Sequence, residues 1–309
     1  MRGLGASPLA AIICAVRFIH PQMRFRVLIR RISHDMVQNM MRRNPTILRL
    51  SVGLLLSLAV AAPVAAEPSP AATATYNAYI AKVEARLKQQ HQSTCVTLEH
   101  EDLALLRGGQ PVVEQITPTG IGKLPGALLY HWRGTAFVPG AHAADFERVM
   151  KDYAAYPQTF SPQMLLAHVL SHNGDHYQVT MRVRQKHILT AVLDITYDVT
   201  FGHGGSDGGN GAASGYTDSR STHIAEIDQA GTPQERVLSP DDEHGYLWRQ
   251  NNYWSYMEKD GGLYIQIESI SMSRSFPAAL GWAIGSFAKS IPRETLDFTL
   301  GAMTKALRK

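Results

Sequence analysis

The sequence predicts an α+β protein in which an antiparallel β-sheet is accompanied by a helix before it and a helix after it. Apolar and polar residues alternate from 176 to 201, which is typical of antiparallel strands with one covered face. An Asn-Gly pair at 173–174 and an Asp-Gly pair at 260–261 indicate two-residue hairpin turns. Apolar residues recur at helical spacing between 296 and 307, close to the C-terminus.

Residues 40–66 have the order of a secretory signal peptide. Arg42 and Arg43 are followed by an apolar stretch and by small residues that end at Ala66. We expect cleavage after Ala66 and export to the periplasm or the medium. The alternative is an uncleaved signal that anchors the chain in the inner membrane. Residues 1–39 show no clear pattern, and we interpret them as a wrongly assigned upstream start or a disordered leader.

The charge of the chain depends on its leader. The 309 residues carry a formal net charge of +4, but the first 66 hold nine arginines and one acid. The rest therefore contains 21 basic and 25 acidic residues. A mildly acidic body gives no support for a nucleic-acid partner. Cys95 is the only cysteine after the leader, so neither an internal disulfide nor a cysteine-based metal site is expected.

The remaining elements follow from spacing and from Pro and Gly. Segment 67–110 is predicted to hold an N-terminal helix, whose apolar residues recur from Tyr76 to Leu87, and a linker. Residues 111–309 are predicted to form one domain. It begins with a strand at 127–140 and a helix that is stopped by prolines. A glycine-rich flexible loop is expected at 202–215. The last helix is expected to start at a Ser290 cap with Pro292 in its first turn.

The Asp260-Gly261 turn fixes which residues of the last hairpin share a face. If these two residues form the loop, Trp254 lies opposite Ile267 and Asn252 lies opposite Ser269. The predicted covered face consists of Trp248, Gln250, Asn252, Trp254, Tyr256, Ile265, Ile267, Ser269 and Ser271. Polar residues among aromatics either satisfy one another in a filled core or line a hollow that receives a ligand.

The Asn173-Gly174 turn leads to a similar prediction. It places His168 opposite Val179, on the covered face, together with Tyr197 and His223. His168, His172 and His176 are spaced by four residues, but a turn between them prevents convergence. We therefore predict no metal site.

Two stretches resemble the START-related helix-grip superfamily, which includes lipid-transfer proteins and polyketide cyclases. The first is DYAAYPQTFSP, with Asp152, Tyr156, Pro157 and Phe160 at the exit of the first helix. The second is YWSYMEKDGGLYIQIESISMSRSFP with the following helix SIPRETLDFTLGAMTKAL. The resemblance covers about residues 111–309. The glycine-rich insertion departs from the usual short connection.

The resemblance implies a curved antiparallel sheet that grips the C-terminal helix, with a hydrophobic cavity between them. It also implies a ligand of the lipid, quinone or polyketide type. The covered-face residues above would contact this ligand, together with His168, Tyr197, Phe298 and Met303. A transient membrane contact during ligand loading is left open. No cofactor and no metal are expected, and the oligomeric state is not predicted.

Three functions remain open from the sequence. The leading one is a non-enzymatic carrier or sensor of a hydrophobic molecule. The second is a cyclase, dehydratase or hydrolase with His168 or His223 as base and Tyr197 as acid. The third is a structural or interaction domain with a filled core.

Overall fold

A computed structural model of the chain describes residues 67–98, 100–122, 124–186, 190–204, 213–275 and 278–308, without the side chains of 100–102, 186 and 278–289. The predictions for the leader, for residues 187–189 of the alternating stretch and for most of the glycine-rich loop lie outside these residues. In the described part the loop is shorter than expected, because strands extend to His203 and resume at Ser214.

An antiparallel sheet forms the centre of the protein. The helices are α4 (Pro70–Ser93), α5 (His100–Arg107), α6 (Ala143–Lys151), the short 3-10 helix η1 (Tyr153–Ala155), α7 (Tyr156–Thr159) and α8 (Ala278–Leu307). The strands are β1 (Val112–Gln115), β2 (Ala127–Pro139), β3 (Met164–Asn173), β4 (His176–Lys186), β5 (Thr190–His203), β6 (Ser214–Asp228), β7 (Arg236–Val237), β8 (Arg249–Lys259) and β9 (Gly262–Arg274). The sheet order is β1-β2-β9-β8-β6-β5-β4-β3, with β7 paired to β6.

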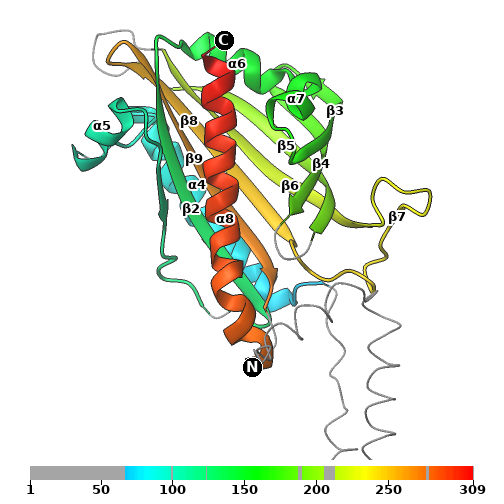
Figure 1. Cartoon of the computed structure of the whole chain (residues 1–309). Coiled ribbons are helices and arrows are strands. Elements are labelled where there is room, and N and C mark those ends of the chain that lie inside the picture. The colour runs from blue at the N-terminus through cyan, green and yellow to red at the C-terminus, as the bar shows by residue number, and fades with distance from the viewer. Residues whose placement is uncertain are drawn as a thin grey trace, which may run out of the picture. The chain divides into compact units, whose positions relative to one another are not determined.

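Helix α8 lies along one face of the sheet, here called the inner face (Figure 1). Its predicted apolar stripe, which comprises Leu296, Leu300, Met303 and Leu307, is buried in the main core. A Cβ added to Gly134 of β2 would lie 2.6 Å from Cδ1 of Leu300, so a larger residue would force the buried Leu300 side chain to move. The predicted α+β architecture, an antiparallel sheet that grips the C-terminal helix, is confirmed.

The sequence predicts that the opposite face, here called the outer face, is solvated. In the structure, α4 covers this face across β2, β8 and β9 (Figure 1). The predicted helical residues Tyr76, Ile80, Val83 and Leu87 are all buried there. They join a second apolar cluster with Tyr253, Ile270 and Met272, which point away from α8. The alternation of apolar and polar residues on β4 and β5 therefore indicates a solvated face only in the part of the sheet that α4 does not cover.

The hairpin of β8 and β9 has the predicted register. Trp254 pairs with Ile267 and Asn252 pairs with Ser269. Asp260 and Gly261 have φ values of 58° and 74°, and positive φ at both central residues is the geometry that an Asp-Gly turn favours.

The register predicted for the β3–β4 hairpin is wrong. Asn173 pairs with His176, so the loop consists of Gly174 and Asp175 rather than Asn173 and Gly174. Gly174 has a φ of 58° at the first loop position, where a glycine is preferred. A bulge at Leu170 shifts the pairing again, and His168 lies opposite Thr180. His168 is therefore exposed and does not belong to the covered face.

Two other assignments to the covered face are wrong. A bulge at Thr222 places His223 opposite Thr196 instead of beside Tyr197, and His223 is exposed. Trp248 precedes β8 and packs in the cluster that contains α4.

The C-terminal helix begins earlier than expected, at Ala278, so Pro292 lies inside it rather than in its first turn. Proline lacks the N–H that an interior position donates, so the packing of the helix has to compensate for one missing hydrogen bond.

Candidate functional site

The inner face carries polar side chains across its middle, in two adjacent rows. The register places each member beside the next across β2, β9, β8, β6 and β5. We call this set the polar belt: Trp132, Ser269, Asn252 and Ser219 in one row, and Tyr130, Ser271, Gln250, Ser221 and Tyr197 in the other. Most of its members are only partly buried, although they lie on the face that α8 covers.

Some members of the polar belt bond to one another. The Ser269 hydroxyl donates to Oδ1 of Asn252 at 2.8 Å, and the Tyr197 hydroxyl donates to Oε1 of Gln250 at 2.9 Å. Oγ of Ser221 accepts the backbone N–H of Gln250 at 2.9 Å. Burial raises the pKa of Tyr197, so its phenol stays protonated at neutral pH.

Apolar side chains surround the polar belt. On one side of the polar belt, the neighbouring inward-facing residues of β9, β8 and β5 include Ile267, Trp254 and Phe201, which belong to the main core. On the other side, Met181, Val183, Ile224 and Leu247 pack against the core but are only partly buried. The inner face thus combines apolar surface for the body of a ligand with uncharged hydrogen-bonding groups for its polar atoms.

The structure brings most of the predicted contact residues together. Gln250, Asn252, Trp254, Tyr256, Ile265, Ile267, Ser269 and Ser271 share the inner face with Tyr197. Met303 is fully buried against this face and Phe298 is partly buried. The sequence reasoning missed Tyr130, Trp132, Ser219 and Ser221, since their strands pair with the last hairpin over long stretches of chain and no local signal marks them.

The residues named for catalysis do not converge. Tyr197 lies on the inner face, whereas His168 and His223 are exposed and their strand partners, Thr180 and Thr196, do not face inward. Neither histidine can reach the phenol of Tyr197. The acid–base pair that the enzyme hypothesis requires is therefore not formed.

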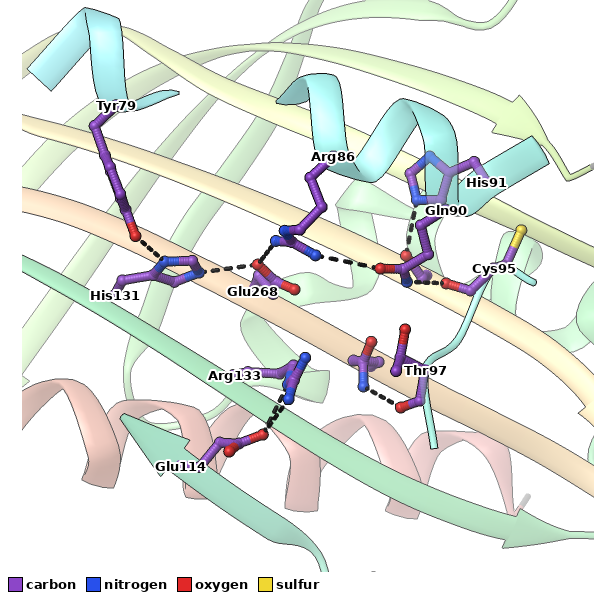
Figure 2. A network of polar contacts seen from close by, with 12 residues as sticks. Tyr79, Arg86, Gln90, His91, Cys95, Thr97, Glu114, His131, Arg133 and Glu268 are labelled. Atoms are coloured by element: carbon purple, nitrogen blue, oxygen red, sulfur yellow. Dashed lines mark hydrogen bonds and ion pairs between the residues drawn. The ribbon is translucent and has the colours of Figure 1, made fainter. Parts of the chain in front are cut away.

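A buried polar network connects α4 to the outer face (Figure 2). Oε2 of Glu268 accepts from Nη2 of Arg86 at 2.5 Å and from Nε2 of His131 at 2.9 Å. Because Nε2 carries the proton, Nδ1 of His131 accepts from the Tyr79 hydroxyl at 2.8 Å. Tyr, His and Glu in series are the groups of a proton relay, but all three are buried and no substrate can reach them. The network therefore fixes α4 to the sheet.

A groove of about 550 Å³ lies beside α4, over β6. Glu84 Oε1 accepts from Arg220 Nε at 2.5 Å and from the Tyr253 hydroxyl at 2.8 Å. Burial, with a further contribution from Glu84, raises the pKa of Asp218 to about 6, although Arg220 opposes this shift. His91 stacks on Tyr216 with ring centroids 4.0 Å apart. These groups are largely paired with one another, so the groove is a weaker candidate than the inner face.

Neither a metal site nor a membrane-spanning helix is found in the part of the chain that the structure describes. Within those residues, no group of three or more His, Cys, Asp or Glu side chains could hold a metal ion. None of the described helices is both long and apolar enough to span a bilayer.

Solved structures that resemble this one include START-related proteins. A STAR-related lipid transfer protein fragment from Xanthomonas axonopodis is 17% identical, with a TM-score of 0.39 over 64% of this chain and 99% of that one. A START superfamily protein from Mycobacterium smegmatis is 14% identical, with a TM-score of 0.38 over 58% of this chain and 97% of that one. The Zhui aromatase/cyclase from Streptomyces sp. R1128 is 12% identical, with a TM-score of 0.39 over 59% and 94%.

Identities of 12–17% and TM-scores below 0.4 say nothing about the function of this chain. No family model matches the sequence, and no curated protein sequence matches it significantly. The function proposed below is therefore based on the side chains of this chain.

Proposed function

We propose that the protein is an exported carrier or sensor that binds a hydrophobic small molecule on the inner face, between the sheet and α8. The observation that carries the proposal is the polar belt. Its uncharged side chains remain partly accessible in the middle of an apolar face that a helix covers. Apolar burial would supply most of the affinity, at about 25 cal/mol per Å² before the cost of ordering the ligand.

Placing a charge on the inner face tests binding. Ile224 packs partly buried beside the core, and the neighbouring His223 points to the outer face. Ile224→Glu is expected to weaken binding of the uncharged fluorescent probe N-phenyl-1-naphthylamine at least ten-fold, because bound probe would remove water from the carboxylate. The matched control is His223→Glu, which adds the same charge one residue away and should bind as the parent does. Equal binding by both variants would show that the probe does not occupy the inner face.

A filled core is the second candidate, and the mutual pairing of Asn252 with Ser269 and of Tyr197 with Gln250 favours it. Native mass spectrometry of the purified full chain separates the two candidates. The carrier proposal expects a stoichiometric hydrophobic molecule or saturable probe uptake, while the filled core expects neither.

Export is the other part of the proposal, and it rests on the order of residues 40–66. We expect the mature protein to start at Glu67. N-terminal sequencing of protein from the exported fraction measures this directly. A mature chain that begins well before Glu67 would favour the uncleaved, membrane-anchored alternative.

A further inference from the structure

We infer that the ligand of the inner face is an uncharged molecule with oxygen atoms at more than one position along its length. This inference rests on the proposed function, because it specifies the class of ligand at that same site.

The dimensions of the polar belt exceed those of a single polar group. It crosses five neighbouring strands, from Tyr130 and Trp132 on β2 to Tyr197 on β5. Four gaps of about 4.8 Å give it a length of about 19 Å, and two rows that are two residues apart give it a width of about 7 Å. A ligand with one polar end would leave most of these groups against hydrocarbon. A ligand that is oxygenated at several positions can pair with them.

The charge of the polar belt defines the charge of the ligand. Every member has an uncharged side chain, and burial raises the pKa of both Tyr130 and Tyr197, which keeps them neutral. Glu226 of β6 and Glu258 of β8 also pair with residues of the inner face, but they lie towards the strand ends. Both oxygens of Glu226 accept hydrogen bonds from the 244–246 segment, and Oε1 of Glu258 accepts one from the N–H of Ala143. Within the side chains that the structure describes, a charged ligand group at the belt would lose its water without gaining a counter-charge.

Trp132 indicates where one oxygen of the ligand binds. Its side chain is 8% exposed and belongs to the main core, and its indole N–H is buried without an acceptor in the described part of the chain. Buried donors of this kind normally have a partner. Trp132 lies beside Ser269 in the same row. A ligand hydroxyl near β2 would accept from the indole N–H and donate to Oγ of Ser269, whose own proton is donated to Oδ1 of Asn252.

A series of ligands with one hydrocarbon chain tests the inference. Hexadecane, methyl palmitate and hexadecane-1,16-diol are uncharged and carry oxygens at none, one and two positions along the chain, and palmitate at pH 8 is the charged comparison. Each would displace N-phenyl-1-naphthylamine from the full exported protein, below its solubility limit. Affinity is expected to rise along the uncharged series by about five-fold for each hydrogen bond gained. Palmitate is expected to bind more weakly than its methyl ester.

Three variants link this order to the polar belt. Trp132→Phe keeps an aromatic ring but removes the donor, and Ser269→Ala removes a hydroxyl without adding volume. Each should weaken hexadecane-1,16-diol about five-fold more than it weakens hexadecane, which loses only apolar contact. Ile267→Val, in the neighbouring apolar row, is the control and should change all ligands by the same factor.

The outcomes distinguish a failure of the inferred ligand class from a failure of the proposed carrier function. Equal affinities for hexadecane and hexadecane-1,16-diol, or palmitate binding as tightly as its methyl ester, would overturn the inference and leave a carrier of another ligand class. Absence of saturable binding by the probe and by every ligand would overturn the proposed function itself, and the inference with it.

Discussion

Replacing Glu268 by leucine is expected to lower the free energy of unfolding by about 3 kcal/mol, as when one partner of a buried ion pair is removed. The Glu268 side chain is 3% exposed, and its loss leaves His131, which is equally buried, without an acceptor. Arg86 is 43% exposed and can return to water, so the cost lies at the lower end of the usual range. Urea denaturation at pH 7 measures the effect.

Glu114→Leu is the matched control for this variant. It also removes a glutamate from an arginine pair near the network, with Arg133, but Glu114 is 48% exposed (Figure 2). Arg133 is 18% exposed, so this pair is partly buried, and the control is expected to lose about 1 kcal/mol, less than Glu268→Leu. Equal losses in both variants would show that the network does not fix α4 to the sheet.

The stabilisation by Glu268 should also depend on pH. Burial raises the pKa of this carboxyl, but the hydrogen bond from His131 and the charge of Arg86 outweigh burial, so the pKa is below the ordinary 4.5. A lowered folded pKa gives a contribution that is complete above the unfolded value and lost as the pH falls through the folded one. The difference between the parent and Glu268→Leu should therefore shrink below about pH 4.5.

Gly134→Val is expected to cost about 1–3 kcal/mol through overpacking against α8. The added Cβ would lie 2.6 Å from Cδ1 of Leu300 and 3.2 Å from Cδ2 of Leu296. Valine suits a strand, so the loss reports on packing and not on β-propensity. Thermal denaturation of the full chain measures it.

Gly301→Ala is the control on the helix side of this contact. An added Cβ at Gly301 meets nothing within 4 Å, so alanine should stabilise the interior of α8 by about 0.5–1 kcal/mol. A Gly134→Val protein as stable as the parent would mean that α8 does not lie this close to β2.

Local signals predicted the elements and one register well. Asp260 and Gly261 adopt the turn that their types favour, so the pairing of β8 with β9 followed from two residues. The stripe from Leu296 to Leu307 predicted the buried side of α8 because helical spacing is a local property. The extra turns before Ser290 were missed, because Pro292 was interpreted as a helix start.

It is harder to predict on which face of the sheet a residue lies, because one inserted residue moves the residues beyond it to the other face. Bulges at Leu170 and Thr222 turned His168 and His223 outward, and no sequence pattern marks a bulge. The position of α4 did leave a signal. Tyr253, Ile270 and Met272 are apolar on the side of β8 and β9 opposite the predicted covered face, and strands that are apolar on both sides are covered on both.

The bulges of β3 have a further consequence for the behaviour of the protein in solution. β3 forms one open edge of the sheet, and Leu170 and Val169 are 55% and 40% exposed there. A long straight edge with apolar side chains would template pairing with another molecule. The pairing of β3 with β4 is interrupted at Leu165 and again at Leu170, so the backbone offers an incoming strand only short regular stretches. The bulge at Leu170, which turns His168 to the outer face, thus also protects the protein against edge-to-edge aggregation.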